Sequence, residues 1–203
     1  MRKASEILYR FRGYILALFT IALLAGPAAP IPQNYSRMVE VGPYIGTLLF
    51  YALGIALRIR ARQFIGQHTR GNTHEAAELV TDGPYAHMRH PLYTSNTYIA
   101  LGAIFFHLGV SGFFHVFIIA IALFEYALAR AEDRFLEEKF GDTWRAWAQR
   151  TPMSSANIEA LFCRNSGDSP ARTVLQAFRA DASTWFWFVF FNLIMVLLKI
   201  YTA

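Results

Sequence analysis

Long apolar runs separated by polar segments dominate the pattern of the chain. Five such runs can be traced, at 14–31, 41–57, 97–110, 112–129 and 184–198. A helix needs about 20 residues, and at least roughly 17, to cross the hydrocarbon core of a bilayer. The first, second and fourth runs reach that length, and the other two reach it when their helices extend into flanking polar residues. The pattern therefore predicts an all-α integral membrane protein with five transmembrane helices.

Turn-forming residues indicate how these helices are connected. Ser111 and Gly112 are the only break between the third and fourth runs, which predicts a short helical hairpin. The helical periodicity of the fourth run continues to Phe140, and Gly141 is a suitable C-cap. Prolines end the first run, because proline cannot continue a helix; they are Pro27, Pro30 and Pro32.

The first apolar run has a second interpretation. A basic lead, an apolar centre and the small residues at 25–28 are also typical of a secretory signal peptide. At the level of the sequence this alternative stays open.

Composition supports a membrane environment. Hydrophobic residues make up 55% of the 203 residues and charged residues 16%, whereas soluble domains carry about 25% charged residues. These values argue against a disordered chain, a disulfide-rich secreted scaffold and an ordinary soluble enzyme. Cys163 is the single cysteine, so the chain forms no internal disulfide and no cysteine-based zinc site.

The distribution of basic residues predicts an orientation. With five spans, 17 Arg and Lys residues fall on one side of the membrane and two on the other. Basic loops stay in the cytoplasm, so we predict a bacterial inner-membrane protein with its N-terminus inside and its C-terminus outside. The long polar segments 58–96 and 130–183 then form cytoplasmic loops that can bind a soluble cofactor.

The first long polar segment concentrates reactive side chains. Residues 85–93 contain two imidazoles, a guanidinium and two phenols. An interfacial loop is the plain alternative, because Tyr and Arg are common at headgroup depth. His87 and His90 lie three residues apart, but Pro91 follows directly and no HExxH helix is present, so we predict no metal site.

Two carboxylates mark the second polar segment. Glu125 and Glu132 are seven residues apart and share a helical face. Glu125 lies about one turn inside the predicted membrane end of its helix, where an ionisable residue is a functional candidate; the alternative is an interfacial pair with an arginine. The charges at 133–139 are predicted to form a solvated face, and His107 and His115 to lie at the outer interface.

Two blocks of the chain resemble a known family. The first block is Leu79-Val80-Thr81-x-Gly83-x-Tyr85-x-x-x-Arg89-His90-Pro91-x-Tyr93, and the second is Glu132-Asp133, Leu136, Phe140-Gly141, Trp144, Trp147 and Pro152. Together they resemble isoprenylcysteine carboxyl methyltransferases and related membrane phospholipid methyltransferases. The resemblance covers about residues 75–152, which would form the methyltransferase core of a single membrane domain, 1–203, with an additional C-terminal span at 183–203.

The resemblance implies S-adenosylmethionine as the cofactor, held in a membrane-embedded pocket. The residues that it carries over to the cofactor site are Leu79, Val80, Tyr85, His90, Pro91, Leu92, Tyr93 and Glu132. The guanidinium of Arg89 suits the donor's carboxylate, and Glu125 or His90 can serve as a catalytic base when the acceptor starts protonated. Two positions depart from the family pattern, Ala77 in place of a cofactor-contacting histidine and Leu128 in place of a substrate-binding arginine.

We therefore expect methyl transfer from S-adenosylmethionine to a lipid or another hydrophobic acceptor at the cytoplasmic face, with no nucleic-acid partner. Two alternatives remain: a membrane reductase of the sterol-reductase type that uses NADPH, and a non-catalytic lipid-binding protein. The sequence does not identify the acceptor atom (O, N or S) or the oligomeric state.

Overall fold

A computed structural model describes residues 2–33, 37–65, 78–155 and 170–202, and this part of the chain contains helices and no strand. The eight helices, in chain order, are α1 Arg2–Leu24, α2 Met38–Phe64, α3 Pro84–His87, α4 Pro91–Leu108, α5 Gly112–Phe140, α6 Asp142–Ala148, α8 Val174–Ala180 and α9 Ala182–Thr202. The prediction of an all-helical protein is confirmed.

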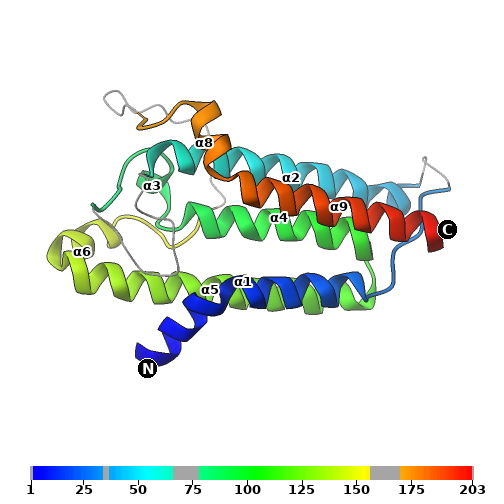
Figure 1. Ribbon diagram of the computed structural model, residues 1–203, viewed down its shortest axis with the longest axis horizontal. Coiled ribbons are helices and arrows are strands. Elements are labelled where there is room, and N and C mark those ends of the chain that lie inside the picture. Colours follow the sequence, from blue (N-terminus) through cyan, green and yellow to red (C-terminus); the bar gives the residue numbers. More distant parts are fainter. Residues whose placement is uncertain (1, 34–36, 66–77, 156–169, 203) are drawn as a thin grey trace.

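The long helices α1, α2, α4, α5 and α9 lie side by side in one bundle (Figure 1). Helix α4 packs between α2 and α5, α1 packs on α5, and α9 packs on α4. The short helices α3, α6 and α8 gather at one end of the bundle, and the two chain termini lie at opposite ends (Figure 1).

Helices α2, α5 and α9 are long and apolar enough to cross a membrane. Their outer faces expose large apolar side chains, for example Leu48 on α2, Ile119 on α5 and Leu193 on α9. Such faces are costly in water and suit contact with lipid tails. The chain is therefore an integral membrane protein by composition and by the placement of its apolar side chains.

Close packing of α2 on α4 depends on Gly54. A Cβ atom at this position would lie 2.8 Å from Cγ1 of Ile99 and 3.0 Å from the backbone oxygen of Ser95. Small residues let helix backbones approach in membranes, where van der Waals contact rather than the hydrophobic effect drives association.

Polar side chains attach α9 to the bundle at three depths. Thr184 accepts a hydrogen bond from Arg58 of α2, Asn192 accepts one from the Tyr51 hydroxyl at 2.8 Å, and Lys199 donates to the backbone oxygen of Ala29. The three α9 positions are eight and seven residues apart, so they share one helical face. This pattern holds the C-terminal helix in one register.

The predicted helix end at Phe140 and the predicted hairpin agree with the structure, whereas α2 ends seven residues after its apolar run and α4 starts six residues before its own. Helix α5 runs to Phe140 and Gly141 ends it with a φ of 55°, and the α4–α5 hairpin turns between Leu108 and Gly112. The first helix was predicted wrongly, because α1 spans Arg2–Leu24 rather than 14–31. The prolines within the predicted run end the helix earlier, since the residue before a proline disfavours the helical conformation.

His107, predicted at the outer interface, lies in the last turn of α4 and points into the protein. Its side chain is fully buried, and its Nε2 lies 3.2 Å from the backbone oxygen of Gly26. The segment that follows α1 folds back over the end of α4 and covers the imidazole. His115 is exposed, as expected for an interfacial residue.

Candidate functional site

The first sequence block begins with a turn that packs on the end of α2. Gly83 adopts a φ of 57°, a conformation that side chains other than glycine rarely tolerate. A Cβ at this position would lie 2.4 Å from the ring of Phe64. The turn directs α3 against α2, and Pro91 then starts α4, where the fixed φ of proline suits the first helical position.

His90 lies at the N-cap of α4 and joins the two sequence blocks. Its side chain is 3% exposed; Nε2 lies 2.8 Å from Oδ1 of Asp133, and Nδ1 lies 3.7 Å from Oε2 of Glu132. Burial lowers the pKa of His90, but the hydrogen bonds and charges of the two carboxylates raise it overall to about 9. The imidazole is therefore protonated at neutral pH and forms an ion pair inside the protein.

Asp133 corrects one of the sequence predictions. It was placed on a solvated face, but it is 4% exposed. Its second oxygen lies 3.4 Å from Nη2 of Arg89, whose guanidinium also lies 5.6 Å from the ring centroid of Trp144. A signal was available in the sequence, because Asp133 follows Glu125 by eight residues and so shares its buried helical face.

The loop after α6 holds this segment from the other side. The backbone N–H groups of Arg89 and His90 donate to the carbonyl oxygens of Pro152 and Met153, at 2.9 and 3.2 Å. The second block therefore contacts the first through both the backbone of this loop and the side chain of Asp133.

An apolar wall borders the charged groups. Tyr85 packs in a cluster with Trp144 and Trp147 of α6, and Nε1 of Trp147 donates to its backbone oxygen at 3.2 Å. The remaining members come from three parts of the chain and are Ala61, Phe64, Ile65, Leu79, Val80, Leu92, Leu136, Phe140 and Ala148. Nearly all predicted cofactor residues thus meet here or beside His90, where the ring of Tyr93 lies 5.6 Å away.

The hydroxyl of Tyr85 is buried without a hydrogen-bond partner among the described residues. Burial raises the pKa of this phenol, and the charges of Arg62, Glu132, Arg58 and Asp181 also act on it. Nε1 of Trp144 is likewise buried without a partner in this part of the chain. Unpartnered buried polar atoms are unfavourable unless a ligand or water satisfies them.

Glu125 lies deeper in the bundle on the same face of α5. Its side chain is buried, and neither carboxylate oxygen has a hydrogen-bond partner among the described residues. The amide of Asn96 and the guanidinium of Arg58 both act on its carboxylate. Two helical turns separate Glu125 from Glu132, about 10 Å along the axis.

Two residues that the sequence treated as loop charges belong to this region. Arg58 and Arg62 were counted in the polar segment 58–96, but α2 continues to Phe64, where Arg58 is buried and Arg62 is half-buried. The helix extends past its apolar run because Asp181 accepts hydrogen bonds from both guanidiniums, at 2.8 and 2.9 Å. No signal in the sequence paired these residues.

The arrangement suits a ligand that carries both charges and an aromatic or apolar part. Carboxylates, guanidiniums and a phenol face one another beside two indoles, and such groups bind ammonium, carboxylate and sulfonium groups. No group of three or more His, Cys, Asp and Glu side chains placed to hold a metal ion was found among the described residues. Leu128 is buried and Arg130 is exposed, while Ala77 lies outside the described residues.

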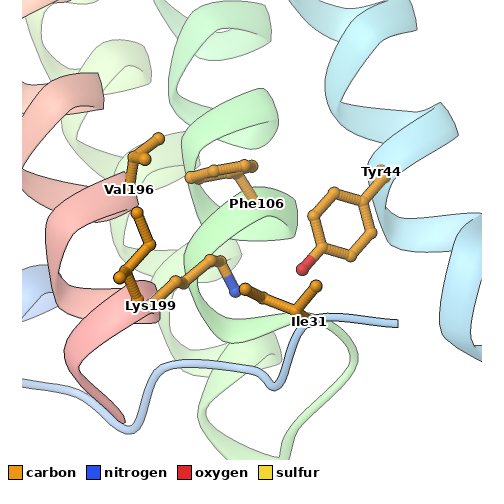
Figure 2. A pocket seen from close by; sticks show the side chains of 6 residues that line it. Ile31, Tyr44, Phe106, Val196 and Lys199 are labelled. Atoms are coloured by element: carbon orange, nitrogen blue, oxygen red, sulfur yellow. The ribbon is translucent and has the colours of Figure 1, made fainter. Parts of the chain in front are cut away.

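A separate cavity of about 210 Å³ lies at the opposite end of the bundle (Figure 2). The amine of Lys199 lies 5.5 and 5.2 Å from the ring centroids of Tyr44 and Phe106, which line it together with Ile31, Val196 and Ile200. Sixteen residues of α4 separate Phe106 from His90, about 24 Å along the helix. This cavity is therefore distinct from the candidate site.

Comparison with known proteins places the chain in a family. The model of the phospholipid methyltransferase family matches residues 41–143, about half of the chain, and this match confirms the resemblance found in the sequence. No solved structure is similar enough to match.

Two curated relatives are named as metal-resistance proteins. The chain is 32% identical over 155 residues to the cobalt-zinc-cadmium resistance protein CzcN of Cupriavidus metallidurans, covering 73% of this chain and 66% of that protein. It is 28% identical over 140 residues to the nickel-cobalt-cadmium resistance protein NccN of Alcaligenes xylosoxydans xylosoxydans, covering 68% and 59%. The matched region thus spans slightly less than two thirds of each relative.

Proposed function

We propose that this chain, which belongs to the phospholipid methyltransferase family, transfers a methyl group from S-adenosylmethionine to a lipid or another hydrophobic acceptor. The observation that supports this most is the contact between the two sequence blocks, where His90 lies 2.8 Å from Asp133 and beside Glu132.

The described residues fit the proposed donor. Its charged groups match Glu132 and Arg89, and the unpartnered hydroxyl of Tyr85 and indole of Trp144 can be satisfied by a ligand. When bound, S-adenosylmethionine supplies an electrophilic methyl group on a sulfonium. The protein aligns the acceptor with this methyl group and excludes water, an effect worth up to about 7–11 kcal/mol. We assign the water-excluding wall to the apolar cluster around Tyr85, Leu79, Val80 and Leu92.

We assign the handling of the acceptor's proton to Glu125. A base is needed only when the acceptor starts protonated. His90 is less suited to this role, because its pKa of about 9 leaves it protonated at neutral pH. Glu125 is buried, has no hydrogen-bond partner among the described residues, and lies on the membrane side of Glu132.

We further propose five membrane crossings, with α1 and α4 joining the three helices that are apolar enough by composition. The clustering of α3, α6 and α8 at one end (Figure 1) and the 17-to-two split of basic residues support a cytoplasmic candidate site. The N-terminus is then cytoplasmic and the C-terminus outside.

Ligand binding to the purified full chain in detergent tests the proposal. We expect S-adenosylmethionine and its demethylated product to raise the melting temperature, because a ligand that binds only the folded state stabilises it by mass action. We expect NADPH to have no effect. Stabilisation by NADPH alone would favour the reductase, and stabilisation by lipid alone would favour the non-catalytic alternative.

Replacing Glu132 with glutamine is expected to weaken S-adenosylmethionine binding about tenfold. The substitution removes one charge-assisted hydrogen bond, worth about 1.5 kcal/mol at the low end of its range. The measurement is a calorimetric titration of the detergent-solubilised protein. Glu138→Gln, an exposed position on the same helix, is the matched control and is expected to bind normally; equal affinities in the two variants would remove Glu132 from the site.

The curated relatives suggest a biological setting. Both are named as resistance proteins for divalent metals, and we propose that methyl transfer by this chain serves the same process. Expression in a metal-sensitive host should raise the growth-inhibiting concentration of cobalt or cadmium, and the Glu132→Gln variant should do so less. Equal growth of hosts that express the wild type and the Glu132→Gln variant would show that methyl transfer does not contribute to metal resistance.

A further inference from the structure

Two arginines on one face of α2 share a single carboxylate. Nε of Arg58 and Nε of Arg62 lie 2.8 and 2.9 Å from the same oxygen, Oδ2 of Asp181. The three side chains are 9%, 12% and 4% exposed. Asp181 occupies the corner between α8 and α9, so it joins the C-terminal helices to the family core. Within this cluster two positive charges face one negative charge.

The cluster borders the candidate donor site. Ala61 lies between the two arginines on α2 and is fully buried in the same apolar cluster as Tyr85. Arg58 also donates from Nη1 to Oδ1 of Asn96 on α4, at 2.6 Å. The buried hydroxyl of Tyr85 has no hydrogen-bond partner in the described part of the chain. The positive charges of Arg62 and Arg58 act to lower its pKa, against the larger effect of burial. Asp181 pairs with both arginines, and its charge acts on the Tyr85 hydroxyl together with theirs.

The carboxylate shared by the two arginines comes from outside the family match. Both arginines lie within the matched residues 41–143, whereas Asp181 lies beyond them. Within the match, the charge of Glu125 acts on Arg58, but the carboxylate that both guanidiniums share comes from Asp181 in the C-terminal extension. Without it, the two neighbouring guanidiniums would favour anions.

We propose that Asp181 is a positioning residue whose charge lets the site accept a cationic methyl donor. The inference rests on the proposed function. S-adenosylmethionine and its demethylated product share every group except the methylated sulfur, which is a cation in the donor and a neutral thioether in the product. The ratio of their affinities therefore isolates the charge felt at the sulfur from any general loss of folding.

The test uses the full chain in detergent, with dissociation constants measured for both compounds. In Asp181→Asn we expect donor binding to weaken about tenfold more than product binding, because unpaired like charges beside the sulfonium are costly. In Arg62→Gln, which keeps the Arg58–Asp181 pair, we expect the preference to shift toward the donor. The double variant Asp181→Asn/Arg62→Gln should return the ratio toward that of the wild type.

Asp142→Asn is the matched control. It also removes an aspartate–arginine pair, at 2.9 Å from Arg145, but its side chain is 97% exposed and outside the site. Equal losses of donor and product in Asp181→Asn, with no shift of the ratio in Arg62→Gln, would make Asp181 a purely structural residue and overturn the inference. If the wild type binds neither compound, the proposed function fails as well, so the two failures are distinguishable.

Discussion

Replacing Asp133 with alanine is expected to lower the free energy of unfolding by about 3–5 kcal/mol, the usual cost of removing one partner from a buried ion pair. The substitution leaves the imidazolium of His90 and the guanidinium of Arg89 buried without their shared carboxylate, which now lies 2.8 and 3.4 Å from them. The measurement is denaturant unfolding of the detergent-solubilised protein.

The control for this prediction lies one helical turn away. Glu137 and Arg145 form a pair of the same length, 2.8 Å, but their side chains are 39% and 56% exposed. Surface pairs contribute little to stability, so Glu137→Ala is expected to unfold at nearly the wild-type denaturant concentration. Equal losses in the two variants would show that burial does not decide the strength of these pairs.

The His90–Asp133 pair predicts how the free energy of unfolding changes with pH. The pKa of His90 is raised from 6.5 to about 9 in the folded protein. Its contribution is therefore fully present below about pH 6.5 and is lost as the pH rises through 9, because the unfolded chain then binds fewer protons than the folded one. In Asp133→Asn, which lacks the carboxylate, this decline should become shallower; an unchanged decline would assign it to another group.

Replacing Glu125 with glutamine is expected to lower the rate of methyl transfer at least tenfold, about 1.4 kcal/mol in the barrier, while S-adenosylmethionine affinity stays near normal. A general base contributes about a hundredfold to ten-thousandfold in rate, and glutamine keeps the shape of the side chain but cannot take a proton. Both carboxylate oxygens of Glu125 lack hydrogen-bond partners among the described residues, so the substitution removes no such bond. The measurement pairs a donor titration with the rate of methyl incorporation on one preparation.

His107→Gln is the control for changing a buried polar side chain. His107 is fully buried near the opposite end of α4, and we expect this variant to keep both donor affinity and turnover when it folds. Full turnover in Glu125→Gln would make Glu125 a structural partner of Arg58, and the acceptor's proton would have to be taken up elsewhere.

Helix ends with a local cause were largely predictable. Gly141 ends α5 as predicted, and a hairpin forms beside the predicted break at Ser111-Gly112, although α4 already ends at Leu108. These effects depend on the conformations of a few neighbouring residues. The end of α2 was not predictable in the same way. The helix continues two turns beyond its apolar run because Arg58 and Arg62 form ion pairs with Asp181, which is distant in the sequence.

The sequence by itself determined the membrane class, the helical fold and the two blocks that identify the family, because hydropathy and motif spacing are local properties. Only the tertiary structure decided which charges meet. His90 pairs with Asp133 across 43 residues and Arg58 with Asp181 across 123. The sign of a charge restricts its partners but does not choose among many candidates; the choice is made where helix ends are brought together in a low-dielectric interior, in which an unpaired charge is too costly to leave.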